Sequence, residues 1–129
     1  MSVRLATGSI AAALALVAIA VAASTSGAAP AAKARSCHLT PSEQRHLGAS
    51  YVTSLHVSHT GCSTGKKVTK AFNKCRHQSG GPAGHCHRAV RRFHCSEHRH
   101  DKLPHVQYDS NVTCKRGAKV VKNTYTQNL

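Results

Sequence analysis

Six cysteines constrain the fold of this chain more than any other feature of its sequence: Cys37, Cys62, Cys75, Cys86, Cys95 and Cys114. Their number is even, and no two of them have the CxxC spacing that is typical of zinc sites, so we expect three disulfides and no bound metal. A domain of about 90 residues buries only a modest fraction of its surface. Three bridges, each worth about 2–4 kcal/mol, would supply much of its stability, and they require an oxidising compartment.

The N-terminal residues have the three parts of a secretory signal peptide. Arg4 provides a positive charge, residues 9–23 are apolar and uncharged, and Ser26-Gly27-Ala28 satisfies the small-x-small rule of signal peptidase. We expect cleavage after Ala28, and Ala32-Lys33-Ala34 is the alternative cleavage site. An uncleaved membrane anchor is disfavoured, because more than half of residues 5–23 are Ala, Gly, Ser or Thr.

This organisation predicts a secreted, extracellular protein with a single domain. Residues 1–28 are the signal peptide, residues 29–36 form a disordered lead rich in Ala and Pro, and residues 37–129 form a disulfide-rich basic domain. The chain contains no Trp, two Phe and three Tyr, so few aromatic side chains are available for a core.

Hydrophobic periodicity predicts the elements of the first half of the domain. Thr40-Pro41-Ser42-Glu43 can open a helical turn. Residues 51–57 alternate as a strand, with Tyr51, Thr53, Leu55 and Val57 on one side. A helix capped by Ser63 or Thr64 follows, because its apolar residues have spacings of three and four: Val68, Ala71, Phe72 and Cys75.

The second half of the domain has weaker signals. Residues 78–84 are a loop by composition, and residues 85–95 are predicted as a strand with Ala89, Phe93 and Cys95 facing inward. Residues 96–105 are polar and are predicted as a long exposed loop. Residues 106–114 and 118–125 form a hairpin with Gly117 at its turn. The expected fold class is α+β, with one main helix packed on an antiparallel sheet of about four strands.

Helix and strand geometry limits the disulfide pairing. Cys62 and Cys75 would lie about 20 Å apart on one helix, so they cannot bond to each other. Cys86 and Cys95 are excluded in the same way by the predicted strand. We favour a bridge from Cys75 to Cys86. Several arrangements remain for the other four cysteines, among which we choose Cys62 with Cys95 and Cys37 with Cys114.

Several short segments resemble small secreted cysteine-rich proteins of actinobacteria. They include residues 51–55, Gly61-Cys62, Cys75-Arg76, Gly84-His85-Cys86, residues 93–99 and residues 111–117, and the resemblance covers roughly residues 48–127. It implies export and a shared disulfide framework. The resemblance implies no activity, and no functional residue is carried over from it.

The formal net charge of +14 favours an anionic partner. Three basic clusters are the candidate polyanion-binding residues: Lys66, Lys67, Lys70 and Lys74; Arg88, Arg91 and Arg92; and Lys115, Arg116 and Lys119. Such clusters bind phosphates through counterion release, so the binding depends on salt. Cell-wall polyanions, lipid headgroups and nucleic acid all fit, and the few aromatic residues make a nucleic-acid reader with stacked bases less favoured.

Eleven histidines leave two alternatives open. Five of them lie within residues 85–100, so a metal site is one alternative, although nearby arginines disfavour a dication. The other is a small nuclease-like hydrolase that uses two His and a Lys or Arg. Histidines that gather at one point would favour a metal site, and two histidines with a Lys in one cleft would favour a hydrolase. Histidines spread evenly over the surface would favour a cationic binding module. The favoured interpretation is a secreted cationic interaction module, monomeric and without a cofactor, that is more probably a binding protein than an enzyme.

Overall fold

The computed structural model describes residues 32–129, without the side chains of residues 101 and 102. The predicted signal peptide and the start of the predicted lead lie outside the described residues. Along the chain the elements are β1 (Arg35–Ser36), α1 (Pro41–His46), β2 (Tyr51–Ser58), α2 (Cys62–Gln78), the short 3-10 turn η1 (Gly81–Ala83), β3 (His94–Leu103), β4 (Gln107–Arg116) and β5 (Lys119–Asn128).

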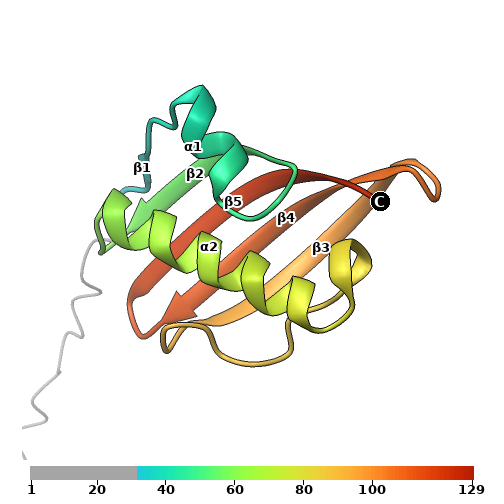
Figure 1. The fold of residues 1–129 in the computed structure, drawn as a ribbon. Helices are drawn as coiled ribbons and strands as arrows, with labels where there is room; N and C mark the ends of the chain where they lie inside the picture. Colours follow the sequence, from blue (N-terminus) through green and yellow to red (C-terminus); the bar gives the residue numbers. More distant parts are fainter. Residues whose placement is uncertain (1–31) are drawn as a thin grey trace, which may run out of the picture.

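The five strands form one antiparallel sheet in the order β1-β2-β5-β4-β3, and α2 lies across one face of it (Figure 1). This confirms the predicted α+β class with one main helix, with one strand more than expected. The side chains on the other face of the sheet are exposed or half-buried, and His56, His98, Asn111 and Lys122 are among the exposed ones. The core therefore lies between α2 and the sheet.

α2 forms as its apolar spacing predicts. Val68, Phe72 and Cys75 are buried against the sheet, and Ala71 is half-buried. The helix begins two or three residues earlier than expected, because Gly61 is its N-cap in place of Ser63 or Thr64. Gly65 lets the helix approach β2 closely, since a Cβ at this position would lie 2.7 Å from Val57 Cγ1.

The segment before β2 is more ordered than the sequence predicts. Thr40 and Glu43 form a reciprocal capping box that starts α1, as the predicted helical turn requires. Arg35 and Ser36 belong to the predicted disordered lead, but they pair with Val57 and His56 as strand β1. The ordered domain thus begins before Cys37.

β2 confirms the predicted strand but not its facing pattern. Leu55 and Val57 are buried as expected, but Val52 is buried and Tyr51 and Thr53 are exposed. A register irregularity between Val52 and Ser54 explains the difference, because an extra residue at a bulge reverses which side chains face the core.

Residues 85–105 differ most from the prediction. Residues 85–93 are not a strand: Ala89 is exposed, and Val90 and Phe93 form an isolated bridge around a tight turn. The predicted loop at 96–105 is instead mostly strand β3, which pairs with β4 along its length. The β4–β5 hairpin is confirmed and is longer than predicted at both strands.

Three disulfides connect cysteines that are neighbours in sequence: Cys37–Cys62, Cys75–Cys86 and Cys95–Cys114. The favoured pairing of Cys75 with Cys86 is confirmed. The pairings of Cys62 with Cys95 and of Cys37 with Cys114 are wrong, because Cys95 and Cys114 lie directly opposite each other on β3 and β4. Strand β1 places Cys37 beside the start of α2, where Cys62 lies.

None of the helices formed by residues 32–129 has the length and apolar character needed to span a bilayer.

Candidate anion-binding site

Most of the predicted polyanion-binding residues are exposed. Lys66 is the exception: it is half-buried, and its Nζ lies 2.5 Å from Glu43 Oε1. The hydrogen bond from Lys66, followed by that from the Thr40 backbone, lowers the pKa of Glu43. Lys66 is therefore engaged by a carboxylate of the chain. Arg88 uses one guanidinium nitrogen to donate to Gln78 Oε1 at 2.8 Å.

The second and third basic clusters come together in space, although they are far apart in sequence. A hollow of about 400 Å³ lies between the first turn of α2, the turn after residue 90 and the β4–β5 hairpin, and it is lined by Thr64, Arg91, Arg92, Phe93, Arg116 and Lys119. We call this the four-cation hollow. Four of the ten predicted residues thus form one local site.

Arg91 and Arg92 form the two central residues of a tight hairpin turn. Val90 N–H donates to the Phe93 carbonyl at 2.9 Å, and Phe93 N–H donates to the Val90 carbonyl at 2.8 Å. Both arginines have positive φ angles, 50° and 66°. Asn and Gly are the residues that such turns favour, because a Cβ in this conformation is close to the following carbonyl.

The buried neighbours of the turn hold it in place. Val90 and Phe93 both lie in the hydrophobic core, and Phe93 is followed directly by β3. The two arginine side chains are exposed. A rigid and conformationally costly turn therefore presents two guanidinium groups at the surface. Backbone strain of this kind costs on the order of 1–3 kcal/mol per residue and is often found at functional sites.

Arg116 and Lys119 close the β4–β5 hairpin, where they form a directly opposed pair. They continue the face on which Cys114 and Val121 are buried against α2. Because side chains alternate along a strand, Lys115 lies on the opposite face of the sheet. The structure therefore separates Lys115 from the other two residues of its predicted cluster.

The electrostatic environment of the four-cation hollow is positive. The first turn of α2 has no acidic residue, and its N-cap is Gly61, which offers no side-chain hydrogen bond. The helix dipole adds a partial positive charge there. Among the residues whose side chains are described, the carboxylates have contacts elsewhere: Glu43 with Lys66, Glu97 with Arg99, and Asp109 with Thr126.

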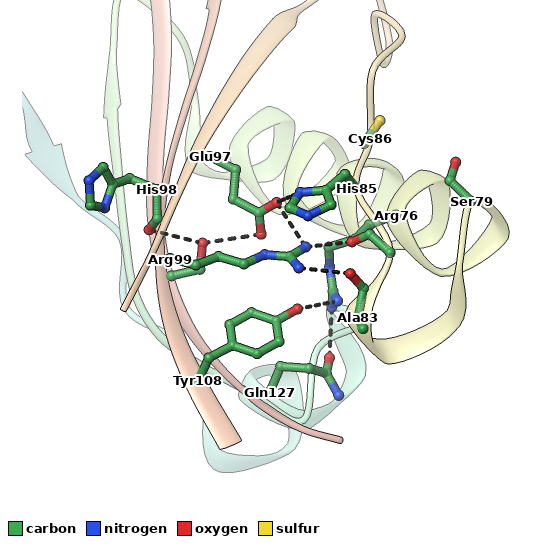
Figure 2. A network of polar contacts seen from close by, with 12 residues as sticks. Arg76, Ser79, Ala83, His85, Cys86, Glu97, His98, Arg99, Tyr108 and Gln127 are labelled. Carbon is green, nitrogen blue, oxygen red and sulfur yellow. Dashed lines mark hydrogen bonds and ion pairs between the residues drawn. The ribbon is translucent and has the colours of Figure 1, made fainter. Parts of the chain in front are cut away.

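A buried polar network lies at the other end of α2 (Figure 2). Arg76 is fully buried, and it donates to Tyr108 Oη at 2.8 Å and to Gln127 Oε1 at 2.7 Å. Glu97 accepts from Arg99 at 3.0 Å and from Ser110 at 3.1 Å, and it also accepts from Tyr125.

Glu97 is the ionised centre of this network. Burial by itself raises the pKa of Glu97, but hydrogen bonds from Arg99 and Tyr125 outweigh burial and hold the pKa below its ordinary value. Burial and the hydrogen bond to Glu97 raise the pKa of Tyr125. A carboxylate that stays ionised in this way is a structural acceptor and not a proton donor. No second carboxylate contacts it among the described side chains, so it does not form a hydrolytic carboxylate pair.

The network attaches the chain after α2 to the sheet. Arg76 donates to the Pro82 carbonyl at 2.5 Å, and Arg99 donates to the carbonyls of Ala83 and Gly84. The Cys75–Cys86 bridge attaches the same segment to α2. The residues that lead to Arg88, Arg91 and Arg92 are therefore held from two sides.

The histidines are distributed over the surface. Ten of the eleven are exposed, and His77 is half-buried. Within residues 32–129, apart from the two side chains not described, no three His, Cys, Asp or Glu side chains are placed to hold a metal ion. Histidine rings do approach each other in two places on this surface: the ring centroids of His98 and His100 are 4.5 Å apart, and those of His85 and His87 are 6.0 Å apart. Neither pair lines the four-cation hollow.

Sequence reasoning missed two parts of this arrangement. Thr64 lines the four-cation hollow from α2, and no sequence signal connects it to residues 91–119. The network of Arg76, Glu97 and Arg99 was also missed. Its signal in the sequence is a set of charged residues of both signs, Arg76 on the predicted helix and Glu97 and Arg99 close together after Cys95. Comparisons of the chain with protein-family models, with curated protein sequences and with solved structures found no match.

Proposed function

We propose that this chain is an exported, monomeric cationic module that binds anionic polymers or surfaces through the four-cation hollow. The observation that carries the proposal is the convergence of Arg91, Arg92, Arg116 and Lys119 around one hollow without a carboxylate. Arginine supplies planar donors that match phosphate and sulfate oxygens. Two of the arginines occupy a costly backbone conformation, which supports a role for their side chains at the surface.

Recognition by charge, without reading of bases, agrees with the position of the aromatic side chains. Phe72, Phe93, Tyr108 and Tyr125 are buried, and only Tyr51 is exposed. A surface with so few exposed rings offers no platform for stacked bases. We therefore expect comparable affinities for heparin, DNA and teichoic acid, and a joint loss of binding as salt increases.

The test compares two pairs of substitutions that remove the same charge from opposite faces. Arg116→Gln with Lys119→Gln changes the four-cation hollow, and Lys115→Gln with Lys122→Gln changes the exposed face of the same two strands. We expect the first pair to weaken binding of a heparin probe at least tenfold and to reduce the salt slope by about 2. The second pair should have a much smaller effect. Equal effects of the two pairs would contradict the proposal.

Export is tested separately. The small disulfide-stapled fold agrees with secretion, and the mature protein should begin at Ala29. With the bridges of Cys37, Cys75 and Cys95 formed, its intact mass should be six hydrogens below the fully reduced value. N-terminal sequencing and mass spectrometry of the exported protein measure both quantities. Free thiols under denaturing conditions, or an N terminus at Met1, would contradict this part of the proposal.

A further inference from the structure

The four-cation hollow is continued by a second hollow along α2. The second hollow has a volume of about 340 Å³ and lies between the helix and residues 88–91. Lys74 and Gln78 line it from the helix, and Arg88 and Arg91 line it from the loop. Arg91 lines both hollows, so they are adjacent.

A third hollow extends the same surface. It has a volume of about 520 Å³ and is lined by Gly48, Lys70, Lys74, His77 and Gln78. It shares Lys74 and Gln78 with the second hollow. The first two hollows follow each other along α2, and the third lies beside the second around the helix, because both are lined by the stretch of α2 from about residue 70 to Gln78. We call the three together the basic track. Every ionisable side chain that lines it is Arg, Lys or His.

The length of the basic track follows from the helix. Thr64 lines its first hollow and Gln78 lines its last. At 1.5 Å per residue these two positions are about 21 Å apart along the helix axis. Phosphates of one strand of a duplex follow each other about every 3.4 Å along the duplex axis, and those of an extended chain are more widely spaced, so the track can contact roughly four to six phosphates.

We propose that the ligand of this protein is a single extended phosphodiester chain that lies along α2 in the basic track and is bound through its backbone. This inference rests on the proposed function and specifies its ligand. Four of the track residues are arginines (Arg88, Arg91, Arg92 and Arg116), whose guanidinium groups donate to two phosphate oxygens at once. Phe93, the aromatic residue of the track, is buried and cannot stack on a base.

The experiment measures the affinity of fluorescent phosphodiester oligomers without bases, containing two, four, six or eight phosphates, by anisotropy at pH 7.5 and fixed ionic strength. We expect affinity to increase at least tenfold from two phosphates to six, and then to increase little. Oligothymidylate of the same phosphate number should bind within about threefold of the oligomer without bases. Much tighter binding of oligothymidylate would overturn recognition through the backbone.

Substitutions at the far end of the track distinguish it from the four-cation hollow alone. Lys70→Gln with Lys74→Gln should weaken the eight-phosphate oligomer about tenfold and leave the two-phosphate oligomer unchanged. Lys115→Gln with Lys122→Gln is the control with the same charge on the opposite face, and matching thermal unfolding shows that both variants are folded. If the control variant loses as much affinity for the eight-phosphate oligomer, binding depends on net charge alone and the proposal of a basic track is wrong.

The outcomes also separate this inference from the proposed function. If the two-phosphate oligomer binds as tightly as the eight-phosphate oligomer and only Arg116→Gln with Lys119→Gln weakens both, the four-cation hollow remains and the track is overturned. If no oligomer and no heparin probe binds at low salt, the proposed function itself is overturned.

Discussion

Arg91 and Arg92 are unfavourable for stability at their positions, but their side chains belong to the proposed binding site. Arg91 and Arg92 occupy the two positions of a turn at which Asn and Gly are preferred. The sequence predicts that both residues belong to a basic cluster on a strand. The structure has a turn there, and a turn without Gly, Asn or Pro has no local sequence signal. Their convergence with Arg116 depends on the fold and has no signal in the sequence at all.

Replacing both arginines with the preferred turn residues should therefore separate stability from binding. We expect Arg91→Asn with Arg92→Gly to increase the free energy of unfolding by about 1–2 kcal/mol, because Gly has no Cβ and Asn tolerates the left-handed conformation better than Arg. The same variant should bind a heparin probe at least tenfold more weakly. Urea unfolding and anisotropy measure the two quantities. A variant that is less stable than the wild type would show that the turn is not strained.

Glu97 is the second residue with a specific expectation. Its side chain is 7% exposed, and Arg99 contacts it at 3.0 Å. Glu97→Gln leaves the guanidinium without its charged partner, so we expect a loss of about 3 kcal/mol of unfolding free energy at pH 7.

The effect of Glu97→Gln should depend on pH. Because the folded-state pKa lies below the ordinary value of 4.5, the ionised carboxylate stabilises the folded protein at neutral pH, and this contribution decreases as the pH falls below that value. The difference between variant and wild type should therefore be largest at pH 7 and shrink toward pH 3. Urea unfolding at both pH values measures it, with Glu43→Gln, whose side chain is less buried than that of Glu97, as a control of smaller effect.

At the scale of elements, the success of prediction depended on apolar periodicity. α2 and the β4–β5 hairpin have a regular pattern of buried residues, and both were predicted. β3 was predicted as a loop because its inward positions include Glu97 and Arg99, whose charges are satisfied only by residues far away in sequence. β2 was correctly predicted as a strand, but its bulge changes which side chains at its start face the core. Alternation of apolar residues in the sequence does not reveal an inserted residue.

The Cys75–Cys86 bridge joins α2 to the loop that carries Arg88 and Arg91, so its loss should affect both stability and binding. It closes a loop of 11 residues and attaches the segment after η1 to α2. Cys75→Ala with Cys86→Ala should lower the free energy of unfolding by about 3 kcal/mol. It should also weaken binding of the eight-phosphate oligomer several-fold, because Arg88 and Arg91 lose a tether.

The matched control for that variant is Cys37→Ala with Cys62→Ala. This bridge joins the segment after β1 to the start of α2, and neither of its cysteines lines the basic track. It should lower stability and leave the affinity of the folded protein nearly unchanged. Equal losses of affinity in both variants would show that the loop is held by other contacts.

The two faces of the molecule differ in how many histidines they carry. The basic track on the helix side contains Lys, Arg and one histidine, His77, and Lys and Arg are fully charged at neutral pH. The exposed face of the sheet has His56 on β2 and His94, His98 and His100 on β3. Histidine is the residue type whose ordinary pKa lies between pH 7.5 and 5.5. With eleven histidines on a chain of net charge +14, acidification can nearly double the positive charge.

Polyanion binding should therefore become stronger at pH 5.5, and the gain should depend on salt. Four of the eleven histidines lie across the sheet from the track, so their charge acts on a ligand in the track through the long-range field. The Debye length is about 30 Å at 0.01 M salt and about 8 Å at 0.15 M. We expect a large increase in affinity on acidification at low salt and a small one at physiological salt. Weaker binding at pH 5.5 under low salt would contradict the cationic-module proposal.

The order of the disulfides along the chain has a consequence for how the protein is made. Of the 15 ways to pair six cysteines, the observed one joins the first to the second, the third to the fourth and the fifth to the sixth, so no bridge encloses or crosses another. When the chain enters an oxidising compartment with its N terminus first, each bridge can close before the next pair of cysteines arrives. Correct pairs then form in the order of synthesis, and the maturing protein has little need of an isomerase to exchange wrong ones.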